Sequence, residues 1–143
     1  MQYTLEDFKK IIARLRAEDG CPWDKVQTHQ TLKEAMLEEA YEAVDAIEKN
    51  DIQNLKEELG DVLLQVVFHS QIEQEQGNFN LSDVITAISE KMITRHPHIF
   101  SNEKVDTPQE VSQNWEQIKK KEKNYKTQSE SMKNVADALP ALI

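Results

Sequence analysis

The sequence predicts an all-α protein, a helical bundle of about five helices with a four-helix-bundle-like core that dimerisation completes. Only three glycines and four prolines occur in 143 residues, and the chain is rich in residues that favour helices. Apolar residues recur at spacings of three and four along most of the chain. This length suffices for one core, and we expect one domain over residues 1–125, followed by a polar linker and an apolar tail over 126–143.

The first two helices have recognisable ends. Thr4 and Asp7 predict the start of a helix that runs to about Ala17, and Gly20 ends it. Thr31 and Glu34 match the T-x-x-E capping box, which predicts a second helix over about 32–49. Its apolar stripe, expected to face the core, consists of Leu37, Ala40, Tyr41, Val44 and Ile47.

The third predicted helix runs from a cap at Asp51 to Gly77 and is apolar on most sides, which is typical of a buried helix. One narrow strip is polar and contains Glu58, Asp61, Gln65 and His69. Since an unpaired buried charge is costly, the acidic face of the second helix is expected to meet this strip.

Two more helices follow. The fourth begins near Leu81 or Ser82 and stops before Pro97, because the residue before a proline resists the α conformation. The fifth begins after Thr107 and Pro108, which supply a cap and a proline at the first helical position.

Four acids on the second and third helices form the candidate site. Glu39 with Glu42, and Glu58 with Asp61, are each three residues apart and therefore share a helix face. Like charges so close are relieved by a cation, and an all-oxygen ligand set suits Mg²⁺ first and Mn²⁺ second. Mg²⁺ often binds substrate phosphates alongside carboxylates, so we expect a phosphorylated small molecule as the substrate.

Charge and cysteine content exclude other classes. The formal net charge is −9, and most of the excess lies between Glu34 and Asp61. An acidic chain argues against binding to nucleic-acid polymers or anionic membranes. The single cysteine, Cys21, forms no internal disulfide, and no long apolar span occurs, so a cytoplasmic location is expected.

Other residues keep two interpretations open. Glu38 is either a plain surface glutamate or a residue that orients water or binds a second metal. Trp23, in the loop after the first helix, either anchors that loop or stacks on a base. Four residues of the fourth and fifth helices are either solvated cations around a core tryptophan or a phosphate-binding face: Lys91, Arg95, Trp115 and Lys119.

Several motifs together resemble the MazG family of nucleoside triphosphate pyrophosphohydrolases, within the all-α NTP pyrophosphatase superfamily. The acids match its EExxE and ExxD signature at residues 38–42 and 58–61. The likeness extends over about residues 5–123, through Gly20-Cys21-Pro22-Trp23-Asp24, Gln27-Thr28-His29, Arg95-His96-Pro97-His98-Ile99-Phe100 and Asn114-Trp115-Glu116-x-Ile118-Lys119.

The resemblance implies Mg²⁺-dependent hydrolysis of nucleoside triphosphates to the monophosphate and pyrophosphate, by a helical homodimer. It implies metal ligation by Glu39, Glu42, Glu58 and Asp61, and substrate binding by Lys91, Arg95, Trp115 and Lys119. Glu38 is then the candidate that orients the attacking water. Longer members carry two such domains, so the chain is expected to be a one-domain form or an N-terminal part.

Two rival hypotheses come from other classes. A di-iron carboxylate bundle needs Glu-x-x-His on two helices, and neither acid pair supplies it. A catalytically weak regulatory or dimerisation module would bind Mg²⁺-nucleotide without efficient turnover.

Overall fold

The computed structural model describes residues 1–101 and 107–123, and within these ranges every regular element is helical. The all-α prediction is therefore confirmed. The chain divides into two compact units, Met1–Leu81 and a second unit that begins at Ser82, and each is described separately below. The predicted tail over 126–143 lies outside the described residues, so the predicted domain boundary remains a prediction.

The first unit begins with α1 (Leu5–Leu15), whose start is capped as predicted. The side chain of Thr4 accepts a hydrogen bond from the backbone N–H of Asp7, and the carboxylate of Asp7 accepts one from the backbone N–H of Thr4. A short 3₁₀ helix, η1 (Asp24–Val26), follows in the connecting loop. Gly20 is required there, because a Cβ atom would lie 2.3 Å from the carbonyl oxygen of Leu15.

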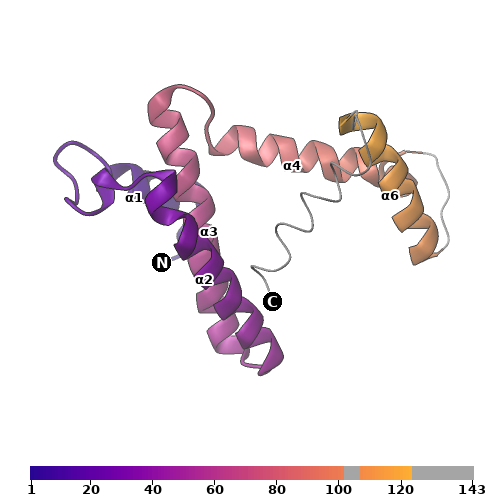
Figure 1. Cartoon of the computed structure of the whole chain (residues 1–143), viewed down its shortest axis with the longest axis horizontal. Helices are drawn as coiled ribbons and strands as arrows, with labels where there is room; N and C mark the ends of the chain where they lie inside the picture. The colour runs from indigo at the N-terminus through magenta and orange to yellow at the C-terminus, as the bar shows by residue number, and fades with distance from the viewer. Residues whose placement is uncertain (102–106, 124–143) are drawn as a thin grey trace. The chain divides into compact units, whose positions relative to one another are not determined.

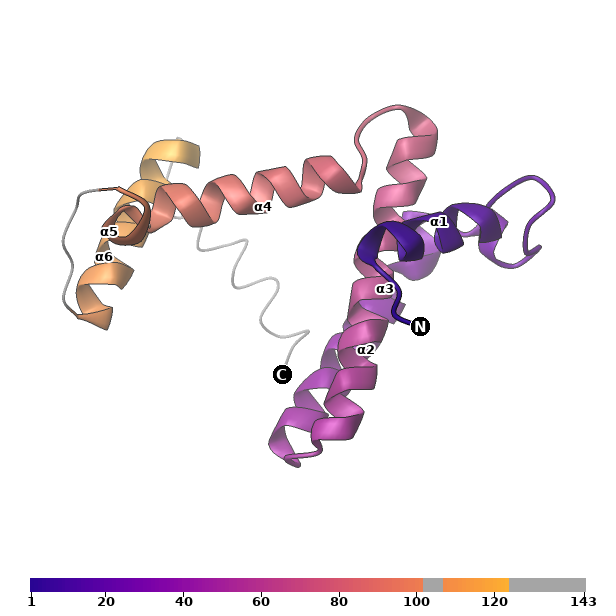
Figure 2. The ribbon, with the colours of Figure 1, turned by 180° about the vertical axis from the view of Figure 1, so that it is seen from behind.

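Two long helices, α2 (His29–Glu48) and α3 (Ile52–Gln76), form a hairpin and lie side by side in both views (Figures 1 and 2). Asp51 caps α3 through the backbone N–H of Asn54, and Gly77 ends it with φ of 78°, as predicted. The predicted start of α2 is wrong by one turn. Thr28 is the N-cap and Thr31 is the third helical residue of the capping box, whereas Thr31 was expected to be the N-cap.

Arg16 fixes the loop between α1 and α2. Its guanidinium group donates two hydrogen bonds to the carboxylate of Glu75 on α3, both at 2.9 Å. The same group donates to the carbonyl oxygens of Asp24 at 2.7 Å and Gln27 at 3.0 Å, and it stacks over the ring of Phe68. Trp23, in the same loop, is 62% exposed and does not anchor the loop in the core.

The core of the first unit gathers α1, the start of α2 and the second half of α3. Its buried members are Ile12, Leu32, Val67, Phe68, Ile72 and Leu81. Farther along α2, the residues that are buried are the small Ala43 and Ala46.

The predicted core stripe of α2 is exposed, which corrects the sequence interpretation. Four of its members keep exposed fractions of 39–58%: Leu37, Tyr41, Val44 and Ile47. These four residues are called the exposed stripe below. The reason is physical: two alanines let the hairpin helices approach closely on the acidic face, so the large apolar side chains are left on the other side of α2.

The second unit contains α4 (Leu81–Arg95), α5 (Pro97–Phe100) and α6 (Pro108–Lys123). Thr107 accepts a hydrogen bond from the backbone N–H of Glu110, as expected for the cap of α6. The short helix α5 was not predicted; Pro97 is its first residue and supplies the fixed φ that such a turn needs. Across the described helices, no stretch is long and apolar enough to cross a membrane.

Candidate functional site

The four predicted acids meet across the α2–α3 hairpin. Glu39 and Glu42 project from α2, and Glu58 and Asp61 project from α3. Each offers a carboxylate oxygen, and these oxygens all lie within 4.8 Å of one another. The spacing of three along each helix produces this arrangement, because it places both acids of a pair on the face that meets the other helix. These four residues are called the acidic cluster.

Two oxygens of the acidic cluster are buried without a hydrogen-bond partner, Oε2 of Glu39 and Oε2 of Glu58. Burial raises the pKa of Glu39, and the charges of Glu42 and Asp61 raise it further. Burial and the adjacent carboxylate of Glu42 raise the pKa of Glu58 to about 7. The cluster therefore holds more negative charge than its protein surroundings compensate.

This donor set fits a hard divalent cation. All four side chains offer oxygen, as Mg²⁺ and Mn²⁺ prefer, and the two unpartnered oxygens lack the positive partner that a bound ion would supply. None of these four residues is a histidine or a cysteine, the ligands that favour zinc.

The polar strip of α3 continues beyond the acids, as predicted. Gln65 is only 6% exposed, and its Oε1 atom has no hydrogen-bond partner. His69 follows one turn later and meets His29, the first residue of α2, with 2.7 Å between their Nδ1 atoms. Nε2 of His29 lies 2.6 Å from the carboxylate of Glu73, and Asn78 donates to that same carboxylate. We call His29, His69, Glu73 and Asn78 the histidine clamp.

Glu38 lies beside the acidic cluster but outside it. Its side chain is exposed on α2, and its charge is among those that raise the pKa of Glu39. Both interpretations of Glu38 therefore remain predictions.

The predicted phosphate-binding residues lie in the second unit, and two of them, Arg95 and Lys119, contact a third, Trp115. The guanidinium carbon of Arg95 lies 5.8 Å from the centre of the Trp115 ring, and Nζ of Lys119 lies 5.2 Å from it. Arg95, Trp115 and Lys119 are called the cation–aromatic cluster. Lys91 stands one turn before Arg95 on α4 and is partly buried.

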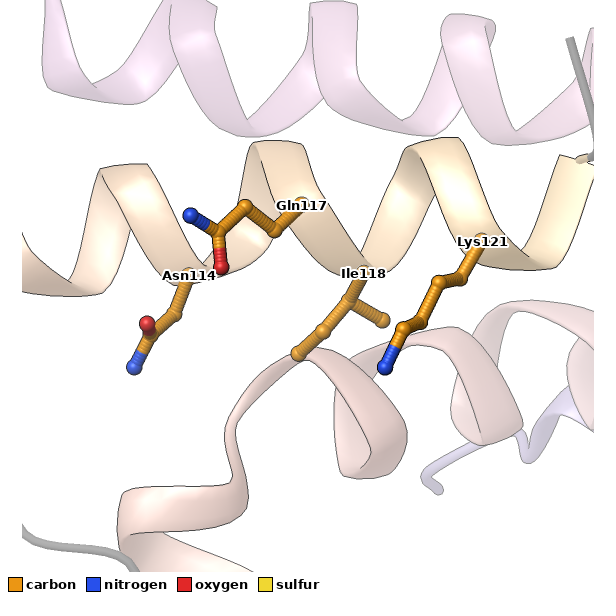
Figure 3. A pocket seen from close by; sticks show the side chains of 4 residues that line it. All are labelled: Asn114, Gln117, Ile118 and Lys121. Atoms are coloured by element: carbon orange, nitrogen blue, oxygen red, sulfur yellow. The ribbon is translucent and has the colours of Figure 1, made fainter.

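A small pocket of about 180 Å³ lies against another part of α6. Among the residues that the structure describes, its lining side chains are Asn114, Gln117, Ile118 and Lys121 of this helix (Figure 3). None of these four belongs to the cation–aromatic cluster, although they alternate along α6 with Trp115 and Lys119.

Sequence reasoning missed two contacts near these sites. His29 was noticed only as part of a motif, since nothing in its spacing indicates a contact with His69 forty residues later. Glu122, whose carboxylate accepts a hydrogen bond from Nε of Arg95 at 3.2 Å, was not singled out either. Its position seven residues after Trp115 places it on the same face of α6, but this spacing does not indicate that Arg95 on α4 is its partner.

Comparison with known proteins agrees with this arrangement. The family described as MazG nucleotide pyrophosphohydrolase domain matches residues 27–100, which include the whole acidic cluster. An Escherichia coli protein named nucleoside triphosphate pyrophosphohydrolase is 46% identical over 93% of this chain and 51% of its own length. A Bacillus subtilis protein named "Uncharacterized protein YabN" is 50% identical over 99% of this chain and 29% of its own length.

The chain thus spans about half of the Escherichia coli relative and less than a third of the Bacillus subtilis one. Among solved structures, a mazG-related protein from Thermotoga maritima superposes with a TM-score of 0.67 and is 34% identical. That comparison covers 81% of this chain and 99% of the other. The family match and these relatives together establish that the chain belongs to the MazG family.

Proposed function

We propose that this chain hydrolyses nucleoside triphosphates to nucleoside monophosphates and pyrophosphate, in a reaction that depends on Mg²⁺, with Mn²⁺ as a substitute. The observation that carries the proposal is the acidic cluster: four carboxylates within 4.8 Å across two helices, with two buried oxygens lacking partners. The name of the Escherichia coli relative supports the same activity.

The acidic cluster is the proposed metal site, with Glu39, Glu42, Glu58 and Asp61 as ligands. A bound Mg²⁺ supplies neutralisation of phosphate charge and a water of lowered pKa. The carboxylates hold their positions through the helix hairpin, so the ligand geometry exists before substrate arrives. Glu38, exposed one residue before Glu39, is proposed to orient the attacking water.

Substrate binding is assigned to Lys91, Arg95, Trp115 and Lys119. Guanidinium and ammonium groups neutralise phosphates that the acidic cluster would repel. Trp115 contacts a cation from each of two helices, Arg95 of α4 and Lys119 of α6. This shared contact supports the assignment of both cations to one substrate-binding region.

The biological setting is proposed to be control of the nucleoside triphosphate pool in the cytoplasm, by a homodimer. The exposed stripe of α2 supports the dimer, because rows of large apolar side chains on a protein surface are typical of interfaces.

The decisive experiment incubates the chain with the common NTPs and dNTPs in the presence of Mg²⁺ and measures pyrophosphate separately from orthophosphate. Glu42→Gln removes one ligand charge and is expected to lower turnover by about 100-fold or more. Glu34→Gln, an exposed glutamate on the same helix, is the matched control and is expected to retain activity.

Each outcome has a defined meaning. Pyrophosphate and monophosphate that disappear in Glu42→Gln support both the reaction and the metal site. Orthophosphate alone would place cleavage at the γ-phosphate and contradict the proposal. Saturable binding of Mg²⁺-NTP without any hydrolysis would contradict it as well and would leave a nucleotide-binding module.

A further inference from the structure

Arg95 is held by one carboxylate in the second unit. Arg95 ends α4 and is 5% exposed. Its Nε atom donates to Oε2 of Glu122 at 3.2 Å, and the side chain of Glu122, near the end of α6, is 30% exposed. This ion pair therefore joins the ends of two helices that are far apart in sequence.

The contact leaves specific donors of the cation–aromatic cluster unused. A guanidinium group has five N–H donors, and Nη2 of Arg95 is buried without a hydrogen-bond partner. Nε1 of Trp115, on the ring that Arg95 covers, is also buried without a partner. Buried donors without acceptors are costly, and two of them on adjacent side chains beside Lys119 suit an oxygen-rich anion.

We propose that Glu122 is a positioning residue for substrate binding: it fixes Arg95 through Nε so that the unpartnered Nη2 atom remains available to a phosphate oxygen. The inference rests on the proposed function, in which Arg95 binds the phosphates. Glu122 does not itself contact substrate; it acts through Arg95.

Two features support positioning rather than simple charge compensation. The guanidinium carbon lies 5.8 Å from the centre of the Trp115 ring, and Glu122 accepts from Nε, so two contacts at different parts of the group restrict its orientation. Arginine recognises phosphate through a planar fork, which makes binding sensitive to this orientation. A carboxylate that only competed for the cation would instead weaken the binding of every anion.

The test uses the full chain and five variants. Glu122→Ala removes the acceptor and the charge, whereas Glu122→Gln removes the charge and keeps an acceptor oxygen. Glu90→Gln removes the same charge from an exposed side chain on α4 and is the matched control. Arg95→Ala, alone and combined with Glu122→Ala, reports whether the two residues act together. KM and kcat are measured for the best NTP substrate, and inorganic pyrophosphate is titrated by calorimetry.

Positioning predicts that Glu122→Ala raises KM and the Kd for pyrophosphate by about tenfold, with a much smaller change in kcat. Glu122→Gln is expected to stay within about threefold of the wild type, because its amide oxygen still accepts from Nε. In the Arg95→Ala background, Glu122→Ala should add nothing. Glu122→Met, which keeps the length of the side chain without an acceptor, replaces the alanine variant if the latter does not melt cooperatively.

The inference is overturned if Glu122→Ala behaves like Glu90→Gln, or if removing the charge tightens binding in both Glu122 variants. Failure of the proposed function is a separate result. A wild type that releases no pyrophosphate from any NTP refutes the reaction, while the pyrophosphate titration still decides the role of Glu122. A wild type that neither hydrolyses NTPs nor binds pyrophosphate overturns both.

Discussion

At the scale of single residues, Glu58 reports the charge of the acidic cluster. In the metal-free protein its pKa is raised to about 7, first by burial and then by the carboxylate of Glu42. An ordinary glutamate releases its proton near pH 4.5. Glu58 therefore contributes stability that is fully present below that pH and is lost as the pH rises through about 7.

The raised pKa of Glu58 predicts that the stabilisation of the protein by Mg²⁺ depends on pH. Added Mg²⁺ should raise the melting temperature more near pH 8 than near pH 6, because at the higher pH Glu58 is ionised and no proton must be displaced. Glu58→Gln should lose this gain and, without metal, should be more stable than the wild type above pH 7. Glu57→Gln, the exposed neighbour, is the control. A gain from Mg²⁺ that is equal at both pH values would contradict the interpretation.

The residues of the acidic cluster were predictable from sequence, whereas Glu122 was not. Spacing of three on two successive helices is a local signal, and the short connection between α2 and α3 leaves few ways to pair their faces. The partner of Arg95 depends on how α4 and α6 pack, since Arg95 and Glu122 are 27 positions apart in the sequence. No periodicity within one helix determines such a contact.

At the scale of helices, the histidine clamp joins the start of α2 to the second half of α3. Only one of the two facing Nδ1 atoms of His29 and His69 can donate, so the pair shares one proton. Burial and the neighbouring His29 lower the pKa of His69. Hydrogen bonds from Asn78 and His29 lower the pKa of Glu73. Because both pKa values are lowered, protonation of His69 or Glu73 at acid pH weakens the histidine clamp.

The clamp therefore predicts a loss of stability with falling pH. The pKa of His69 is lowered in the folded state, so the protein loses stability as the pH falls below the usual histidine pKa near 6.5. Glu73 contributes stability at pH values above the ordinary glutamate pKa near 4.5, and this stability is lost as the pH falls through the lowered pKa of Glu73. In urea unfolding between about pH 7.5 and 5.5, His69→Gln should lose less stability than the wild type. An equal loss of stability in His69→Gln and the wild type would show that the histidine clamp does not cause the pH dependence.

Helix ends were predicted well where a local cap decides them and badly where two caps compete. Asp51 and Gly77 bound α3 as expected, because a capping side chain and a left-handed residue act locally. For α2, both Thr28 and Thr31 offered hydroxyl caps. The clamp then favours the earlier start, because His29 must be helical to reach His69 and Glu73.

At the scale of the whole molecule, the exposed stripe is the feature that the described residues of the first unit do not cover. Leu37, Tyr41, Val44 and Ile47 were predicted to face the core, and periodicity correctly identified them as one face of the helix. It could not tell which neighbour covers that face. The sequence alone gives no information on whether an apolar stripe packs within one chain or against another.

The proposed homodimer makes the stripe testable. Val44→Lys combined with Ile47→Lys should convert the chain from dimer to monomer in light scattering at micromolar concentration, because two buried charges would oppose association. Glu34→Lys combined with Glu48→Lys changes the same helix at exposed polar positions and should leave the mass unchanged. A monomeric wild type under these conditions would refute the dimer.

The short turn between α2 and α3 also affects how the protein folds. All four carboxylates of the acidic cluster lie between residues 39 and 61 on one helix hairpin. Loop closure is entropically cheapest for contacts so close in sequence, and such local contacts form early. The mutual repulsion of these carboxylates therefore opposes the hairpin from its first closure onward, and a cation that relieves it acts on the nascent hairpin as well as on the finished site.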